Sequence, residues 1–156
     1  MFDDARLRVM ELAGEGYSCA QIVLCMGLDL LGRENPGLVR SMSGLAMGAR
    51  YGSICGALTG GLCLIALHTG KGRALERPLP QGTTLMDSLL TWFIVEELGG
   101  EIEPNCAEIL ESRGRRFDLS AGPSSACADL AAHIWTKAVF LLREYGLDPA
   151  RGREED

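Results

Sequence analysis

The apolar residues of this chain recur at spacings of three and four over most of its length, which is the period of an amphipathic helix. The stretch from residue 84 to residue 98 shows the pattern well, with Leu85, Leu89 and Trp92 on one stripe and two glycines directly after it. No stretch alternates apolar and polar residues as a half-buried strand does. The pattern therefore predicts an all-α fold, a compact single-domain bundle of about six or seven helices.

Capping residues, glycines and prolines mark where these helices begin and end. The predicted helices are residues 3–13, 19–31, 36–47, 54–68, 84–98, 106–112 and 125–145. Pro78 and Pro80 exclude regular structure from the loop at residues 69–83. We expect residues 1–147 to form one cysteine-containing helical domain and the charged segment 148–156 to be a disordered tail.

Charge and composition narrow the classes of function. A net charge of −6 and a pI near 5.0 argue against binding to nucleic acid, which needs a basic face. Two short basic clusters, at residues 71–77 and 113–116, are expected to be solvated loop charges. The longest nearly uncharged apolar stretch, residues 54–67, is too short and too rich in glycine to insert into a membrane.

The six cysteines are too few for a disulfide scaffold, and the first residues lack the basic and apolar regions of a secretion signal. The expected compartment is therefore the reducing cytoplasm. Repeated cysteines in that compartment serve metal binding or redox chemistry more often than permanent disulfide bonding.

Four of the cysteines fall in the first turn of a predicted helix. Cys19 and Cys106 each follow a capping residue and precede Gln or Glu at the spacing of a capping box. Cys55 and Cys127 follow serines able to cap their helices, which are Ser53 and either Ser124 or Ser125. Because a helix N-terminus favours a thiolate over a thiol, these four cysteines are the predicted catalytic or metal-binding residues. Cys19 and Cys106 have the better-supported caps and are the predicted low-pKa thiols.

Glycines recur every four residues at Gly44, Gly48, Gly52, Gly56 and Gly60, and wherever this stretch is helical they form one small-residue ridge. The ridge indicates either tight helix packing or a close approach of the backbone around Cys55 to a second helix start or an inorganic cluster. We expect residues 50–53 to break the ridge. Three glycines near Cys55 are candidates for cofactor contact, namely Gly56, Gly60 and Gly61.

The cysteine and glycine motifs together resemble a known family. They are Ser-Cys-Ala-Gln around Cys19, Gly-Ser-Ile-Cys-Gly-Ala-Leu-Thr-Gly-Gly around Cys55, and single cysteines at Cys106 and Cys127. This order resembles the family of small redox-active proteins named C_GCAxxG_C_C for its spacing, over about residues 15–140. The resemblance implies a helical protein whose redox role rests on these cysteines, and related segments occur in cytochromes that also hold iron–sulfur centres.

Three mechanisms fit the four cysteines. They could converge as thiolate ligands of an iron–sulfur cluster or a zinc ion, with helix N–H groups donating to the sulfurs. Alternatively, two of them could form a reversible dithiol and disulfide that passes electrons to a redox partner protein or a small oxidant, and four cysteines allow three pairings. The chain would then be a thiol-dependent oxidoreductase or an electron-transfer protein. The third mechanism is not redox: a helical binding or oligomerisation module, such as a homodimer, with buried and inert cysteines.

The remaining polar candidates are weaker. Cys25 and Cys63 lie within apolar helix stretches and are expected to pack in the core. His68 and His133 could complete a metal site but are expected to be hydrogen-bonded core or boundary residues. Two tyrosines near the cysteines, Tyr17 and Tyr51, are candidates to line the site.

Overall fold

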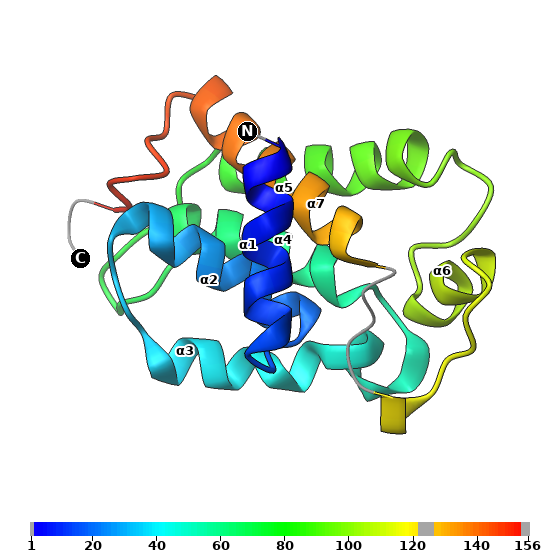
Figure 1. The fold of residues 1–156 in the computed structure, drawn as a ribbon. Helices are drawn as coiled ribbons and strands as arrows, with labels where there is room; N and C mark the ends of the chain where they lie inside the picture. The colour runs from blue at the N-terminus through cyan, green and yellow to red at the C-terminus, as the bar shows by residue number, and fades with distance from the viewer. Residues whose placement is uncertain (1, 122–126, 154–156) are drawn as a thin grey trace.

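The computed structural model describes residues 2–121 and 127–153, and over these residues the fold is all-α, as predicted (Figure 1). The α-helices are α1 (Phe2–Gly14), α2 (Cys19–Leu31), α3 (Pro36–Ser41), α4 (Gly56–Thr69), α5 (Gly82–Trp92), α6 (Cys106–Ser112) and α7 (Ala128–Glu144). A wider turn, η3 (Phe93–Glu97), continues α5, and short 3-10 turns lie at η1 (Met42–Leu45) and η4 (Leu119–Ala121). Within the described residues the one strand-like pairing is an isolated antiparallel bridge between Ile54 and Asn105.

The ends of α2 illustrate how local sequence sets a helix. Ser18 is its N-cap, and the Gln21 side chain accepts a hydrogen bond from the Ser18 backbone N–H at 3.0 Å, which is one half of a capping box. Gly32 ends the helix in the left-handed conformation with φ 65°, which glycine adopts without a steric cost. The predicted bounds of this helix, residues 19 and 31, are those of the structure.

The predicted helix at residues 36–47 is wrong in its second half. The α-helix ends at Ser41, the 3-10 turn continues to Leu45, and the chain then winds the other way through the left-handed turn η2 (Gly48–Gly52). Met47, Ala49 and Arg50 have φ values of 56°, 56° and 62°, a region that costs a non-glycine residue about 1–2 kcal/mol. A hydrogen bond of 3.0 Å from the Ser53 N–H to the Gly48 carbonyl closes the turn. This strained turn ends at Gly52, shortly before Cys55.

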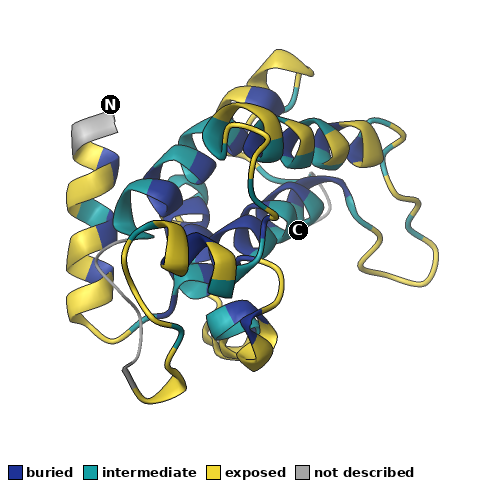
Figure 2. Cartoon of the chain, turned by 90° about the vertical axis from the view of Figure 1, so that its right-hand side faces the viewer, coloured by how far each residue is buried: buried dark blue, intermediate teal, exposed yellow. Residues whose placement is uncertain are grey.

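The bundle is built around α4, which packs against α2, α5 and α7, while α1 lies against α2 and α7 (Figure 1). Figure 2 shows buried residues along the inner sides of the helices and exposed residues along their outer sides. Leu58, Leu64 and Ile65 of α4 are at most 1 % exposed. Each such side chain contributes roughly 1.5–3 kcal/mol on burial. No helix among the described residues combines the length and apolar character needed to cross a bilayer.

The predicted glycine ridge is real only where the chain is α-helical. Gly56 and Gly60 face α2 across a close helix contact, whereas Gly44 faces open space within 4 Å. Gly48 and Gly52 lie in the left-handed turn with φ values of 63° and 71°. The ridge therefore breaks as expected near residues 50–53, and its α4 part brings the start of α4 against the start of α2.

The segment after α7 lies against the body of the protein. The Pro149 carbonyl lies 3.2 Å from His68 Nε2, and Arg153 donates to the carbonyls of Gly70 and Arg77 at 2.6 Å and 3.0 Å. Arg153 also forms an ion pair of 3.2 Å with Glu76. Residues 154–156 lie outside the described residues, so the domain boundary at residue 147 and the disordered tail beyond it stay predictions.

Candidate thiol site

The four cysteines singled out in the sequence all lie at helix starts in the structure. Cys19 and Cys106 are the first residues of α2 and α6, and Cys55 and Cys127 are the N-cap residues of α4 and α7. The predicted placement is therefore confirmed for each of them. All six cysteines of the chain are free thiols.

The caps themselves differ from the prediction in detail. Asn105 is the N-cap of α6, but its side chain makes no capping hydrogen bond, and Glu108 accepts instead from the Glu103 N–H at 3.0 Å. Ser53 is not the cap of α4 because Cys55 itself occupies that position. Ser124 and Ser125 lie outside the described residues.

Backbone hydrogen bonds join the segment of Cys55 to that of Cys106. The Cys55 N–H donates to the Pro104 carbonyl at 2.8 Å, and the Cys106 N–H donates to the Ser53 carbonyl at 2.7 Å. Between these two bonds Ile54 and Asn105 face each other as an antiparallel pair. Cys55 and Cys106 each directly follow a member of that pair, so the bridge fixes the backbones of the two cysteines against each other.

Cys19 reaches the same region from α2. A Cβ atom built on Gly56 would lie 3.7 Å from Cys19 Cβ and 3.2 Å from the Leu45 carbonyl oxygen. The first distance is an ordinary van der Waals contact and the second is a tight one, so the start of α2 lies beside the residue after Cys55, and the close approach at Gly56 is to the Leu45 carbonyl. The start of α2 is the second helix start near Cys55 that the glycine pattern indicated.

The four thiols are close enough to affect one another's ionisation. Cys55 is buried, whereas Cys19, Cys106 and Cys127 are partly exposed. Negative charge on Cys55 raises the pKa of each of the other three thiols. Among the described groups, no cysteine charge is found to raise the pKa of Cys55 itself. Burial raises the pKa of Cys55 as it does that of the other three thiols.

The prediction that Cys19 and Cys106 are the low-pKa thiols is wrong. Burial, with the charges of neighbouring thiols added, raises the pKa of Cys19 to about 12 and that of Cys106 to about 11. Removal of a thiolate from water costs more than the partial charge of one helix N-terminus returns. The capping pattern thus located these cysteines correctly at helix starts, but it did not predict the pKa of their thiols.

Cys55 has the most support for a negative charge. Burial raises its pKa, and three groups oppose that effect: the N–H groups of Leu58 and Ala57 in the first turn of α4, and the Arg113 guanidinium. Because Cys55 is the N-cap residue, its sulfur faces the free N–H groups of the helix that it begins. These backbone N–H groups therefore lower the pKa of the Cys55 thiol directly.

Arg113 is a site residue that the sequence analysis missed, since it was assigned to a solvated basic cluster. It is the C-cap residue of α6, and its Nη1 donates to Asp129 Oδ1 at 2.7 Å. Its charge lowers the pKa of Cys55 and of Cys127, while the Asp129 charge raises that of Cys127. Sequence spacing gave no signal for this pair because the two residues come from different helices.

Several weaker candidates lie elsewhere. Tyr51 is 89 % exposed, so it does not line the thiol site, whereas Tyr17 packs against the same core as Cys19 and stays a candidate. Cys25 and Cys63 pack against the two apolar clusters of the bundle, as predicted.

The two histidines are hydrogen-bonded. His68 is 3 % exposed and lies between the carbonyls of Leu64 and Pro149, which agrees with a core histidine. His133 Nδ1 lies 2.5 Å from Glu97 Oε1 in a partly buried pair that joins α7 to η3. Neither observation assigns them a role at the thiol site.

The glycines proposed for cofactor contact lie within helix contacts. A Cβ atom on Gly60 would lie 2.8 Å from the Ala20 carbonyl oxygen, and one on Gly61 would lie 2.6 Å from Ile134 Cγ2. Close helix packing is therefore enough to explain why glycine stands at these two positions. Their contact with a cofactor stays a prediction, as does that of Gly56.

Four thiols are the right donors for an iron–sulfur cluster or zinc by their chemistry. Over residues 2–121 and 127–153, however, no three side chains of His, Cys, Asp or Glu are arranged so that they could hold a metal ion. The donor set fits such a group and the arrangement of the described residues does not. Metal binding by Cys19, Cys55, Cys106 and Cys127 therefore stays a prediction.

A family model described as "Putative redox-active protein (C_GCAxxG_C_C)" matches residues 17–140, which is well over half of the chain and includes all four helix-start cysteines. No curated protein and no solved structure matches the chain.

Proposed function

We propose that this chain, which belongs to the C_GCAxxG_C_C family of redox-active proteins, is a thiol–disulfide redox protein whose reacting pair is Cys55 and Cys106. The observation that carries the proposal is the pair of backbone hydrogen bonds, from Cys55 to Pro104 and from Cys106 to Ser53. They fix the two cysteine segments against each other, although 51 positions separate the two residues in the sequence. The family assignment supports a redox role and leaves open which cysteines react.

The geometry of the bridge supports a reversible bond. Diagonal neighbours on one face of an antiparallel pair lie about 7–8 Å apart. A disulfide needs two Cα atoms roughly 4.4–6.8 Å apart. The two Cα atoms would therefore have to move closer than an ideal bridge holds them, which suits a disulfide that forms and opens during a redox cycle.

Burial assigns the two cysteines different roles. The partly exposed Cys106 meets the substrate, a disulfide of a partner protein or a small molecule. Its thiolate attacks one substrate sulfur, forming a mixed disulfide and releasing one substrate thiolate. The buried Cys55 thiolate then attacks Cys106 Sγ, forming the Cys55–Cys106 disulfide and releasing the second substrate thiolate. Two electrons pass to the substrate, and the two protons lost by Cys55 and Cys106 protonate the released thiolates.

Two features support Cys55 as the resolving thiol. The N–H groups of Leu58 and Ala57 and the Arg113 charge lower its pKa against the effect of burial, and it is shielded from substrate, so it attacks only a sulfur that the fold brings to it. The raised pKa of Cys106 makes its first attack slow at neutral pH. We therefore expect exchange to quicken as pH rises toward the pKa of Cys106.

Thiol counting and peptide mapping of the oxidised protein test the proposal. Mild oxidation with excess oxidised dithiothreitol should remove two of the six thiols, and mass spectrometry should identify one linked peptide pair containing Cys55 and Cys106. Cys55→Ser and Cys106→Ser should each abolish that pair. Cys63→Ser is the matched control because Cys63 lies in α4 but outside the cluster, and it should leave the pair intact. A different linked pair, or none, would refute the assignment.

Metal binding is the second candidate function, favoured by the four thiol donors that stand at helix starts. Cys19, Cys55, Cys106 and Cys127 would hold the zinc ion or iron–sulfur cluster, which would supply Lewis-acid or electron-transfer chemistry. Iron, zinc and acid-labile sulfide measured on protein purified without oxygen test this alternative. About one metal per chain or more, with few reactive thiols, would favour it over the dithiol.

The non-redox alternative, a helical module or homodimer with inert cysteines, would show thiols that neither react nor bind metal.

The proposed dithiol cycle belongs in a reducing compartment such as the cytoplasm, where thiols are kept reduced between turnovers. The physiological donor and acceptor would be disulfide or dithiol compounds or proteins, and a nucleic-acid partner is not expected.

A further inference from the structure

The helix that carries Cys106 lies at the edge of the bundle. In Figure 1, α6 is set apart from the packed helices, and its principal packing partner is the turn Gly48–Gly52. A Cβ atom on Gly52 would lie 3.1 Å from Ala107 Cβ, which places that turn against the second residue of α6. The first turn of α6 is therefore held by the bridge to Cys55 and by this contact.

The other end of α6 is held by an ion pair. Arg113 caps the C-terminus of the helix and donates to Asp129 at 2.7 Å, and Asp129 lies in the first turn of α7, two residues after Cys127. The two side chains are 29 % and 37 % exposed, so the pair is partly shielded from water. The middle of α6 is anchored in the core by Ile109 and Leu110, which are 1 % and 5 % exposed. Loss of the ion pair would let the helix tilt about this apolar anchor, and such a tilt moves its first residue, Cys106.

We infer that the Arg113–Asp129 ion pair is a latch that positions Cys106 at Cys55 and so sets the effective concentration of one thiol at the other. This inference rests on the proposed Cys55–Cys106 dithiol. Arg113 and Asp129 are positioning residues in this scheme, because they act through the orientation of α6. A tilt of a few degrees is enough to misplace a sulfur at the bridge for disulfide closure, which demands a narrow geometry.

The test is the equilibrium constant between the Cys55–Cys106 disulfide and dithiothreitol, measured at pH 7 for Arg113→Gln and Asp129→Asn. Both variants break the latch, and each should lower the equilibrium constant about threefold to fivefold, the size expected for a partly shielded ion pair. The two variants change the charge beside the thiols in opposite directions. A lower equilibrium constant in both variants therefore indicates that the pair acts by positioning Cys106. A lower constant in one variant and a higher one in the other would show that the pair acts by its charges and would overturn the latch.

Restoring the pair provides the second measurement. Arg113→Lys keeps a cation at the position and should recover part of the loss. The double exchange Arg113→Asp with Asp129→Arg should recover more than either single reversal. Hydrogen exchange at residues 106–112 should be faster in Arg113→Gln than in the wild type, because the C-terminal end of α6 then lacks its ion pair with Asp129.

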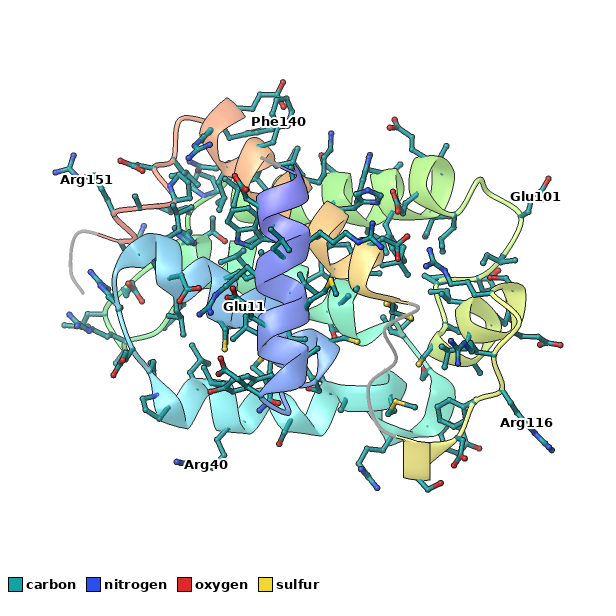
Figure 3. The ribbon with its side chains drawn as sticks, in the orientation of Figure 1. Glu11, Arg40, Glu101, Arg116, Phe140 and Arg151 are labelled. Atoms are coloured by element: carbon teal, nitrogen blue, oxygen red, sulfur yellow. The ribbon has the colours of Figure 1, made fainter. Side chains whose placement is uncertain are left out.

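Two controls separate the latch from general stability. Arg8→Gln breaks a comparable ion pair, Arg8 with Asp29 at 2.9 Å, far from α6, so it should lower the melting temperature and leave the equilibrium constant unchanged. Arg116→Gln removes a nearby exposed charge that points away from the body in Figure 3, and it should change neither quantity.

The outcomes distinguish this inference from the function on which it rests. Absence of the Cys55–Cys106 disulfide in the wild type would defeat the proposed function and the latch together. A wild-type disulfide whose equilibrium constant is the same in Arg113→Gln and Asp129→Asn would overturn the latch alone.

Discussion

Gly60 of α4 lies directly against Ala20 of α2, so closely that a Cβ atom on Gly60 would be 2.8 Å from the Ala20 carbonyl oxygen and 3.0 Å from its Cα. Neither atom can move away without moving the α2 backbone, because both belong to it. Cys19 is the residue before Ala20, and Gly56, one turn before Gly60, faces Cys19. The contact therefore sets the distance between the first turns of α2 and α4, where two of the four cysteines lie.

We expect Gly60→Ala to destabilise the protein by about 1–3 kcal/mol, since the added methyl group must push the two helices apart. Chemical denaturation under reducing conditions measures the change. Gly44→Ala is the matched control from the same glycine series, because a Cβ atom at that position would have no neighbour within 4 Å. A Gly60→Ala protein as stable as Gly44→Ala would show that the helix contact is looser than described.

Ala49→Gly should stabilise the fold, by up to about 1 kcal/mol. Ala49 is exposed and has φ 56°, so glycine removes left-handed strain from the native state, although it also adds freedom to the unfolded chain. Ala66→Gly in the right-handed α4 is the control and should destabilise by about 1 kcal/mol. Equal losses of stability in both variants would contradict a left-handed turn at residue 49.

Stability should fall in alkaline solution because the fold raises the pKa of the Cys19 thiol. The folded-state pKa of Cys19 is raised from 9.0 to about 12, so its contribution is complete below pH 9 and is lost as pH rises toward 12. A shift of that size corresponds to at most about 4 kcal/mol. Urea denaturation from pH 7 to pH 11 with a non-thiol reductant measures the decline. Cys19→Ala should flatten it, and Cys63→Ala, at a less buried position, should flatten it far less.

His68→Phe should loosen the segment after α7. The substitution removes the ring nitrogen that lies 3.2 Å from the Pro149 carbonyl and leaves that buried acceptor unpaired, at a cost of about 1–3 kcal/mol. Trypsin should then cleave after Arg151 or Arg153 faster than in the wild type. His68→Gln keeps a donor on the side chain and should restore part of the protection, whereas cleavage rates independent of residue 68 would argue against this attachment.

Helix starts were largely readable from the sequence, because a cap depends on residues three or four apart. The bounds of α2 follow from the Ser18 and Gln21 box, and Asn105 is the N-cap residue of α6 although its side chain makes no capping hydrogen bond, so the locations of Cys19 and Cys106 could be predicted. The all-α class followed from apolar periodicity for the same local reason.

The left-handed turn could not be predicted in the same way. Met47, Ala49 and Arg50 carry no preference for positive φ, and the conformation persists because Ser53 and α6 hold both sides of the turn. The acidity of the thiols was also misjudged, since the helix dipole is local and visible in sequence while burial depends on the whole fold.

The sequence by itself determined that this protein is helical and that four cysteines stand at helix starts, because periodicity and capping are short-range properties of the chain. Only the tertiary structure decided that the Cys55 segment pairs with the Cys106 segment and that Arg113 meets Asp129. These contacts join residues from separate helices, and their energies exist only once the helices have packed. Local sequence therefore placed the thiols along the chain, and long-range packing set their neighbours, their burial and their charge.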